Sequence, residues 1–380
     1  MEKRKSIIKV SILVTFIIFL VIVSALYVTN LNFRTSVDKF FDREVSENNL
    51  KSIEINSEEN PIISAYDKYI VVLSKGVLKI YNQNGDVVST NDINITSPMM
   101  QANGKYLIIA ENGGKKFCVV YENQILWQES VEGAISKINI NPNGYVSLIV
   151  TNTTYKSLVL VYNQSGKELF RTYVSATYAL CTDISNNNRY LAIGEVDYSG
   201  TIIKSKVKII SMDLAKNDAE NAIVNKYESE PGEIITDLNY QIGDNVYCKF
   251  SNYIQKVTNN SNERVLDFTD KMLFVDIKLK NSIVIFEKQS SSLLSVDYLV
   301  KIKNLSTNKE TVYFQDLSLI NSLKTSNENI GLNFVTSVQI LKKNGWLSKR
   351  YITGKEIKDI VISDDIAGIV YKDKIEIIGL

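Results

Sequence analysis

The chain contains no histidine among its 380 residues, and this limits the chemistry that its side chains can perform. Ser–His–Asp and Cys–His nucleophilic pairs both need an imidazole as base. Histidine-based zinc sites lose their nitrogen ligands for the same reason. The acid spacing of an EF-hand and the Gly-Lys-Ser/Thr loop that cradles phosphate are also missing from the sequence. We therefore expect no cofactor and no metal, and carboxylates are the remaining catalytic option.

Two aspartates are the candidates for such chemistry. Asp183 and Asp237 fall on or next to segments that we expect to be the innermost strands of neighbouring repeats. Glycosidases place paired carboxylates around a substrate in this way, one acting as acid and the other as base or nucleophile. The alternative is that each aspartate caps a turn or meets water at a strand end. We favour this alternative, so no residue is assigned as catalytic, cofactor-binding or metal-binding.

The three cysteines indicate packing rather than redox chemistry. Cys118, Cys181 and Cys248 are spaced by 63 and 67 residues, and no Cys-x-x-Cys motif occurs. An odd number cannot be fully paired within one chain. Each cysteine lies in or beside an apolar run, where a thiol serves as a small buried hydrophobic group. A disulfide between two of them is left open.

A repeated phrase indicates which elements position these side chains. Residues 81–86 (YNQNGD) recur as residues 162–167 (YNQSGK), and a degraded copy stands between them at 121–124 (YENQ). A period of about 40 residues, built from short apolar runs and Gly/Asn turns, is typical of a β-propeller. The fold class is therefore all-β, with residues 50–380 forming the propeller.

The number of blades follows from the ends of the third strands. We place these ends near residues 81, 121, 162, 211, 257, 303, 342 and 380. Eight markers predict eight blades, with seven as the alternative if residues 228–315 hold fewer repeats. A polar and partly helical insertion is expected at residues 213–226. Residues 374–380 form a third strand without a fourth, and we predict that residues 51–56 supply it and close the ring.

The N-terminal segment predicts a membrane anchor. Residues 10–28 form a run of 19 without charge, glycine or proline, preceded by a basic tail at residues 1–9. Such a run spans nearly all of a hydrocarbon core about 30 Å thick, and the basic flank favours a cytoplasmic N-terminus. The propeller would then lie outside the cytoplasm. A signal peptide cleaved near residues 23–25 is the competing interpretation.

The linker at residues 29–49 has an apolar stripe at helical spacing. Phe33, Val37, Phe40 and Phe41 fall at i, i+4, i+7 and i+8, which is one face of a helix. A short amphipathic helix there would lie on the membrane surface, dock on the propeller or serve as a stalk.

Charge argues against a nucleic-acid partner. Residues 1–34 hold five basic side chains and one acid, which leaves 38 basic and 41 acidic side chains in the remainder. A nucleic-acid-binding domain would show a clustered basic face. The 21 tyrosines favour strand packing between blades, and a smaller number at loop tips could contact a partner.

Three further phrases carry a family resemblance. Residues 188–193 (NRYLAI) are similar to the Asp-Gly-Lys-Tyr-Leu-Ala second-strand phrase of WD40-like and quinoprotein-like repeats. Two segments are similar to the Gly-x-x-x-Trp outer-strand phrase of the same repeats: residues 166–170, with Phe170 in the Trp position, and residues 123–127, with Asn123 in place of Gly. The chain thus resembles WD40-like and quinoprotein-like propellers. Its layout resembles an uncharacterised family of single-pass, membrane-anchored propellers from low-GC Gram-positive bacteria. The resemblance implies fold and not function, because Gly-His and Trp-Asp pairs and dedicated cofactor ligands are missing.

These observations predict a non-enzymatic, membrane-anchored propeller in the cell envelope. It would act as a binding, scaffold or sensor module, with a protein or cell-wall polymer held on one face of the ring. The alternative is a carbohydrate-active enzyme that uses channel-facing carboxylates.

Overall fold

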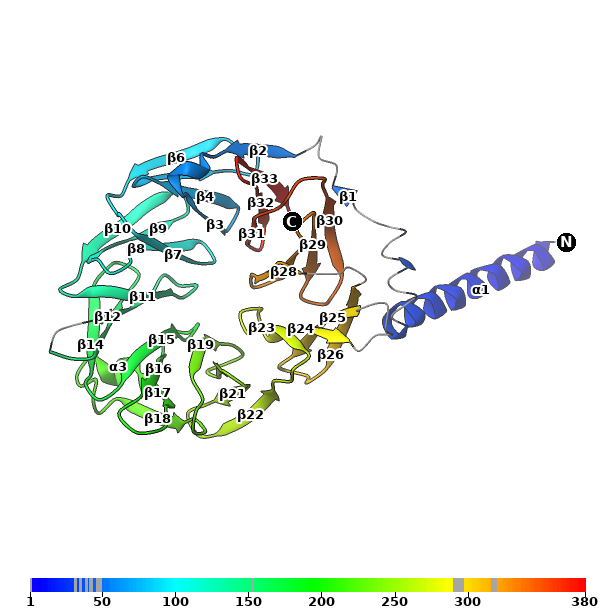
Figure 1. Ribbon diagram of the computed structural model, residues 1–380. Coiled ribbons are helices and arrows are strands. Elements are labelled where there is room, and N and C mark those ends of the chain that lie inside the picture. Colours follow the sequence, from blue (N-terminus) through cyan, green and yellow to red (C-terminus); the bar gives the residue numbers. More distant parts are fainter. Residues whose placement is uncertain are drawn as a thin grey trace.

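The computed structural model describes residues 2–30, 50–151, 154–289, 297–315 and 320–380, together with positions 33, 36, 37, 40, 44 and 45. Its strands form eight sheets arranged as blades around a central axis (Figure 1). The predicted eight-bladed propeller is confirmed and the seven-bladed alternative is wrong. Residues 228–315 hold a full complement of strands, as a count of eight requires.

Each blade is an antiparallel sheet of four strands, which follow one another from the inner to the outer edge of the ring. Blade 1 holds β3 (Ile62–Tyr66), β4 (Tyr69–Ser74), β5 (Val77–Tyr81) and β6 (Val87–Asp92). Blade 2 holds β7 (Pro98–Asn103), β8 (Tyr106–Glu111), β9 (Lys116–Tyr121) and β10 (Gln124–Ser130). Blade 3 holds β11 (Ala134–Ile140), β12 (Val146–Thr151), β13 (Ser157–Tyr162) and β14 (Glu168–Val174). Blade 4 holds β15 (Tyr178–Ile184), β16 (Tyr190–Asp197), β17 (Lys204–Ser211) and β18 (Ile223–Glu228).

The second half of the ring follows the same order. Blade 5 holds β19 (Ile235–Tyr240), β20 (Val246–Phe250), β21 (Tyr253–Val257) and β22 (Asn262–Asp267). Blade 6 holds β23 (Met272–Asp276), β24 (Ser282–Gln289), β25 (Asp297–Asn304) and β26 (Glu310–Gln315). Blade 7 holds β27 (Ser322–Thr325), β28 (Asn329–Asn333), β29 (Ser337–Lys342) and β30 (Leu347–Ile352). Blade 8 holds β31 (Asp359–Ile362), β32 (Ile366–Val370), β33 (Lys374–Gly379) and β2 (Lys51–Glu54).

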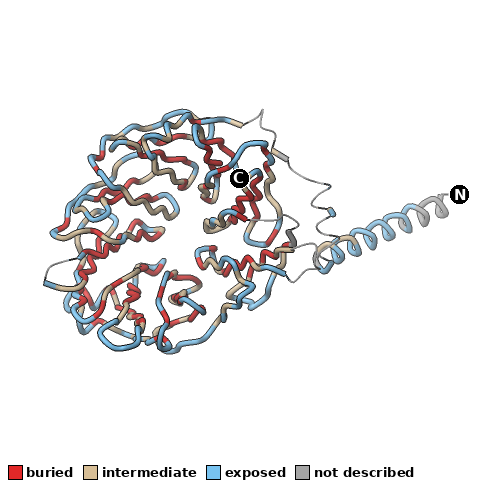
Figure 2. Tube along the Cα trace, viewed as in Figure 1, coloured by how far each residue is buried: buried red, intermediate tan, exposed pale blue. Residues whose placement is uncertain are grey.

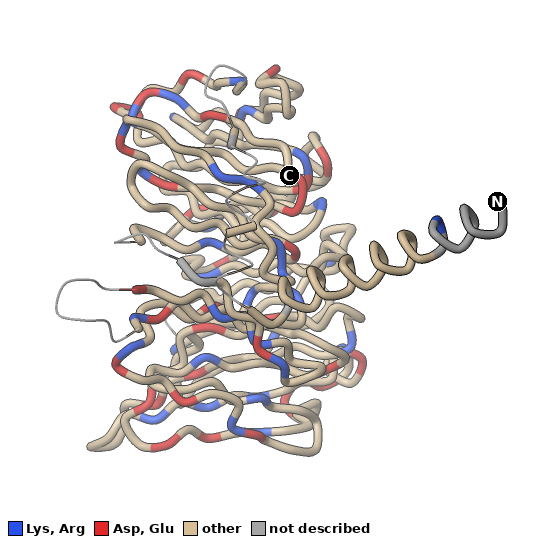
Figure 3. Tube along the Cα trace, turned by 90° about the vertical axis from the view of Figure 1, so that its right-hand side faces the viewer, with Lys and Arg blue, Asp and Glu red and all other residues tan. Residues whose placement is uncertain are grey.

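The core lies between the blades. Val71, Ile108 and Leu148, on the second strands of blades 1 to 3, are fully buried because neighbouring sheets cover both of their faces. Outer strands such as β6 are mostly exposed, and Figure 2 shows buried residues concentrated inside the blades. The packing between blades predicted for most tyrosines is seen at Tyr69 and Tyr106, which are buried, and at Tyr145 and Tyr190, which are partly buried against the core. Basic and acidic residues are interspersed along the edge of the ring (Figure 3).

The repeated phrase forms the hairpin that follows a third strand. Asn82 Oδ1 accepts hydrogen bonds from the main-chain N–H groups two and four residues later, and Asn163 Oδ1 does the same. Gly85 and Gly166 hold φ angles of 80° and 82°, a region that favours glycine. The phrase is therefore a turn signal repeated because the blades repeat.

The ring closes as predicted. β2 pairs antiparallel with β33, with Lys51 opposite Ile377 and Glu54 opposite Lys374. One further pairing was not predicted: β1 (Glu44–Val45) adds in parallel to the outer edge of blade 7, where Glu44 lies opposite Arg350. Both ends of the propeller are thus attached to strands distant in sequence. A short 3-10 helix, η2 (Ser57–Glu59), joins β2 to blade 1.

The predicted insertion at residues 213–226 was too long. The structure has a four-residue helix, α3 (Met212–Ala215), after which the chain reaches β18 at Ile223. Residues 223–226 belong to this outer strand, since Ile223 lies opposite Ile210 and Lys226 opposite Lys208. The strand alternates between partly buried and exposed side chains, and the exposed positions account for its polar sequence.

The N-terminal segment is helical. α1 (Glu2–Thr29) contains the predicted span at residues 10–28. Within the part of the chain that the structure describes, no helix has both the length and the apolar character needed to cross a membrane. The span therefore stays a prediction. In the linker, Phe33, Val37 and Phe40 are helical, and Phe41 lies outside the described residues.

Candidate functional site at the mouth of the central channel

A pocket of about 790 Å³ opens where the inner strands end and turn into the second strands. All eight blades contribute to its lining. Six carboxylates and four lysines line it, together with many amide side chains. These charged residues are Asp67, Lys105, Lys137, Asp183, Asp237, Lys278, Lys280, Glu328, Asp364 and Asp365. A pocket of this size and polarity suits a polar ligand or the tip of a protein loop.

Asp183 joins two blades. Its Oδ2 accepts a hydrogen bond from the main-chain N–H of Tyr240 at 2.6 Å, and its Oδ1 accepts one from the N–H of Ile184 at 3.0 Å. The side chain is 8% exposed, and burial raises the pKa of Asp183 to about 7. Both carboxyl oxygens of Asp183 therefore accept main-chain hydrogen bonds, which gives this residue a structural role in joining the two blades.

Asp237 lies on the neighbouring inner strand and pairs with a lysine from blade 6. Its Oδ2 is 3.5 Å from Lys278 Nζ, and its Oδ1 accepts a hydrogen bond from the N–H of Leu238. The charge of Asp237 raises the pKa of Lys278. The structure thus places both predicted aspartates in one pocket, on the inner strands of blades 4 and 5 as expected.

Amide side chains link the blades around this mouth, a feature that sequence reasoning missed. Asn103, Asn141, Gln241 and Asn329 each donate a hydrogen bond to a main-chain carbonyl of the next blade, at distances of 3.2, 3.1, 2.6 and 2.9 Å. Ser363 donates to the carbonyl of Asp67 and joins the last blade to the first. The sequence feature that marks these links between blades is an amide or hydroxyl residue near the first turn of successive repeats.

The cysteines are free thiols. Cys118 and Cys248 are buried, and Cys181 lines the channel pocket. Burial raises the pKa of Cys118 to about 12, so this thiol stays protonated at neutral pH. The role predicted for them as small hydrophobic groups agrees with these positions. Among the described residues no group of three or more Asp, Glu and Cys side chains is placed to hold a metal ion.

The ring of eight antiparallel blades defines a β-propeller. Residues 42–380 match a family of unknown function (DUF5711), and the chain belongs to that family. No curated protein sequence matches the chain.

Solved structures resemble the propeller at low sequence identity. The C-terminal WD40 domain of Sif2 superposes with a TM-score of 0.58 at 10% identity, over 87% of this chain and 98% of that one. BamB from Moraxella catarrhalis gives a TM-score of 0.47 at 11% identity, over 89% of this chain and 99% of that one. Hydrazine synthase from Kuenenia stuttgartiensis gives 0.44 at 11% identity, over 86% and 97%. At such identities the likeness to Sif2 shows the fold alone.

Proposed function

We propose that this protein is a membrane-anchored, extracytoplasmic binding module that acts as a scaffold or sensor in the cell envelope. Its partner, a protein or a cell-wall polymer, would bind at the mouth of the central channel. The observation that carries the proposal is the polar pocket of about 790 Å³ to which every blade contributes. A pocket of this kind presents many hydrogen-bonding groups to one partner from a single rigid scaffold.

The rim of the pocket is held in place before any partner arrives. The main-chain N–H of Lys280 donates to the carbonyl of Asn327 in the next blade at 3.0 Å, while the side chain of Lys280 is exposed in the pocket. The amide links described above fix other parts of the rim in the same way. Preorganisation of this kind reduces the entropy that is lost on binding.

A second candidate function is a carbohydrate-active enzyme, and one observation favours it. Asp183, with a pKa of about 7, lies in the same pocket as Asp237, which forms an ion pair with Lys278. Two carboxyl groups in such different environments can act as acid and base. Against it, both oxygens of Asp183 accept main-chain hydrogen bonds. Loss of a glycan-cleaving activity in both Asp183→Asn and Asp237→Asn would support the enzyme.

Placement in the envelope is part of the proposal and is supported by the sequence. The uncharged run at residues 10–28 follows a basic tail at residues 1–9, which favours a cytoplasmic N-terminus. A topology reporter fused after Leu380 tests this placement. We expect signal from a reporter that is active outside the cytoplasm, and signal only from a cytoplasmic reporter would contradict it.

The binding proposal is tested by affinity capture from detergent-solubilised membranes. Full-length protein should retain a partner, and Lys280→Glu should lose it because the substitution reverses a charge in the pocket. Lys271→Glu is the matched control, since Lys271 is exposed on the same blade, immediately before β23, and does not line the pocket. If Lys280→Glu and Lys271→Glu captured equal amounts of the partner, the partner would bind outside the channel mouth.

A further inference from the structure

A contact between two aromatic rings joins α1 to the propeller. The rings of Tyr27, in the last turn of α1, and Trp346, on blade 7, have centroids 5.4 Å apart and planes inclined at 72°. This edge-to-face arrangement is a favourable one for aromatic pairs. Trp346 remains 53% exposed beside the contact. The contact therefore places an exposed indole ring at the C-terminal end of the helix.

A tight hairpin between β29 and β30 holds Trp346 in this position. The main-chain N–H of Lys342 donates to the Trp346 carbonyl at 2.8 Å, and the Trp346 N–H donates to Asn344 Oδ1 at 3.1 Å. Gly345 has a φ of 83° and rests on blade 6, where a Cβ would come within 2.8 Å of the Thr311 methyl group. The indole ring is thus presented by a turn that is fixed within the ring of blades.

The apolar surface of α1 ends at the level of this hairpin. Every large apolar side chain from Ile12 to Ile22 is between 46% and 64% exposed, so the described part of the chain leaves this stretch uncovered. A helix that is apolar all round needs an apolar environment. The uncharged run continues to Val28. Its C-terminal end therefore coincides with Tyr27 and, through the ring contact, with Trp346.

We infer that Trp346 lies in the lipid–water interface of the membrane and holds the rim of blade 7 against the lipid surface. This lipid contact rests on the proposed function, in which residues 10–28 anchor the protein. The C-terminal end of a run that spans the hydrocarbon core lies at the outer boundary of that core, and a ring in contact with Tyr27 lies at the same depth. Tryptophan and tyrosine favour this zone because they combine an apolar ring with a polar N–H or O–H group.

The same hairpin determines which face of the ring is turned toward the membrane. In an antiparallel blade the first–second turn and the third–fourth hairpin lie at one end of the strands, and the second–third hairpin lies at the other. Trp346 lies in a third–fourth hairpin, so it shares a face with the channel mouth, which opens at the first–second turns. Figure 3 shows α1 extending beyond the ring on one side. The channel mouth is therefore turned toward the lipid surface, and a partner reaches it from the space between the ring and the membrane.

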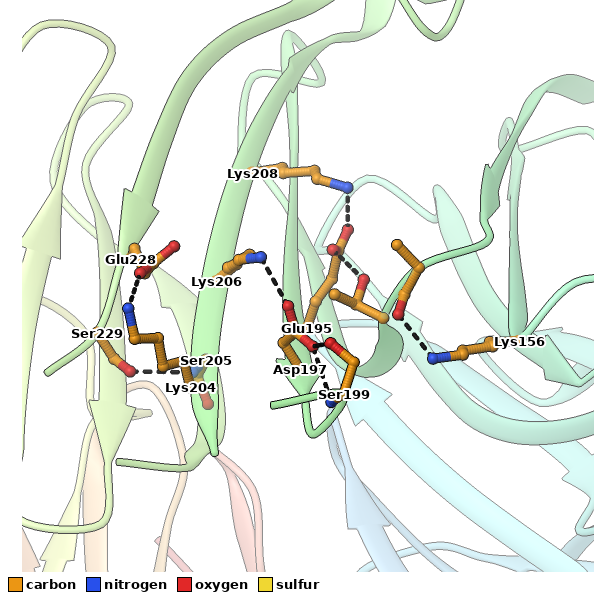
Figure 4. A network of polar contacts seen from close by, with 12 residues as sticks. Lys156, Glu195, Asp197, Ser199, Lys204, Ser205, Lys206, Lys208, Glu228 and Ser229 are labelled. Atoms are coloured by element: carbon orange, nitrogen blue, oxygen red, sulfur yellow. Dashed lines mark hydrogen bonds and ion pairs between the residues drawn. The ribbon is translucent and has the colours of Figure 1, made fainter. Parts of the chain in front are cut away.

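An equally exposed aromatic ring on the opposite face offers a matched control. Tyr198 is 51% exposed and lies in the second–third hairpin of blade 4. Asp197 holds the start of this hairpin, because it accepts hydrogen bonds from the N–H of Ser199 at 3.1 Å and from its Oγ at 2.6 Å. Asp197 also pairs with Lys206 at 2.9 Å (Figure 4). Since this hairpin lies at the other end of the strands, we expect it to stay in water.

The test is quenching of tryptophan fluorescence by brominated lipid, with full-length protein in bilayer nanodiscs. Trp127 and Trp346 are the two tryptophans of the chain, so Trp127→Phe leaves Trp346 as the reporter. The nanodiscs hold equal parts of phosphatidylglycerol and phosphatidylcholine, and the phosphatidylcholine carries bromine on its acyl chains either near the headgroup or near the chain ends. We expect bromine near the headgroup to reduce Trp346 emission about twofold or more, and bromine near the chain ends to reduce it less.

Two further proteins show whether the quenching is specific to Trp346. Trp346→Phe keeps Trp127, which packs against Phe117 and Tyr162 of blades 2 and 3 and should not be quenched. Tyr198→Trp, in a protein with phenylalanine at both native tryptophan positions, should emit equally with and without bromine. Unchanged thermal unfolding shows that each variant is folded. If Trp127→Phe does not fold, the difference between the unmodified protein and Trp346→Phe gives the emission of Trp346.

Failure of the lipid contact is distinguishable from failure of the anchor. Flotation of proteoliposomes after a carbonate wash reports on the anchor alone. Protein that floats, but in which Trp346 is quenched no more than Tyr198→Trp, would overturn the lipid contact and leave the anchor standing. Stronger quenching of Trp346 by bromine near the chain ends would also contradict an interfacial position. Protein that does not float would overturn both.

Discussion

Asp183 Oδ2 accepts a hydrogen bond from the main-chain N–H of Tyr240 at 2.6 Å, across the boundary between blades 4 and 5. The carboxyl group that looked most suited to catalysis therefore holds two blades together. It does so from a buried position, where ionisation costs free energy. The stability of the protein should depend on pH through this group.

Asp183→Asn should remove that dependence. The pKa of Asp183 is about 7 in the folded protein and about 3.9 when unfolded. Between these values the folded state holds a proton that the unfolded state has lost, so the free energy of unfolding falls as pH rises. Asparagine cannot ionise, yet it keeps an oxygen for the Tyr240 N–H. In the variant, the slope of the free energy of unfolding against pH should be smaller by up to about 1.4 kcal/mol per pH unit.

Urea unfolding at pH 4.5, 6 and 8 measures the effect. The variant should gain stability relative to the unmodified protein as pH rises. Asp270→Asn is the control, because Asp270 is exposed on blade 6 and should leave the slope unchanged. Parallel slopes for Asp183→Asn and the unmodified protein would contradict the prediction.

Asn329→Ala should weaken the boundary between blades 7 and 8. Asn329 Nδ2 donates to the carbonyls of Ser363 and Asp364, both at 2.9 Å, and Oδ1 accepts from Lys342 at 2.8 Å. Because the site is buried, these partners lose their hydrogen bonds without gaining water, at a cost of about 1–3 kcal/mol. Chemical denaturation measures this loss in the free energy of unfolding. Asn260→Ala, in an exposed turn, should change stability by less than about 0.5 kcal/mol.

Ile53→Ala tests the closure of the ring. Ile53 lies on β2, is 2% exposed, and is opposite Ile375 on β33. Truncation of a buried isoleucine costs about 2–5 kcal/mol of stability. In Ile53→Ala this loss weakens the packing of β2, the strand that closes the ring. Hydrogen exchange should accelerate in β33, whereas the exposed Lys51→Ala should leave it unchanged. Undisturbed protection of β33 in Ile53→Ala would show that β2 does not stabilise the ring.

Tyr351→Phe should destabilise the protein more at pH 7 than in acid. Burial acts to raise the pKa of Glu376, but hydrogen bonds from Lys374, Tyr351 and Tyr371 outweigh it, so the pKa is lowered. This stabilisation is present above the unfolded pKa of about 4.3 and is lost as pH falls through the folded pKa.

Tyr351 Oη donates to Glu376 Oε2 at 2.5 Å. Removal of this donor to a charged acceptor should cost about 1.5–3 kcal/mol at pH 7, measured by urea unfolding at pH 7 and pH 3. Tyr145→Phe is the control, since the Tyr145 hydroxyl has no hydrogen-bond partner among the described residues and only its main-chain N–H and carbonyl form hydrogen bonds, both to Asn141. If Tyr351→Phe lost the same free energy of unfolding at both pH values, this would contradict the prediction that Tyr351 donates to an ionised Glu376.

The sequence predicts the ring well because its signals are local. A tyrosine followed by an asparagine turn and a glycine marks the end of a third strand at Tyr81 and Tyr162, and the degraded phrase at 121–124 marks it at Tyr121, so all three observed ends match the predicted positions. The closing pair is also predictable, since a missing strand at one end of the chain and an extra strand at the other complement each other.

The sites depend on long-range packing and are harder to predict. Asn141 and Asn329 look like ordinary turn residues until the next blade places a carbonyl against them. The alternation of β18 between partly buried and exposed side chains appears only when its register with β17 is known. The polar appearance of β18 made it look like part of an insertion for the same reason.

The parallel pairing of β1 with β30 has a mechanical consequence. β1 stands between α1 and the closing strand β2 along the chain. Tension applied through α1 therefore loads the attachment to blade 7 before it reaches the β2–β33 seam. A pull on the N-terminal segment would detach two residues from an outer edge first, and the closed ring would bear force only after that attachment had yielded.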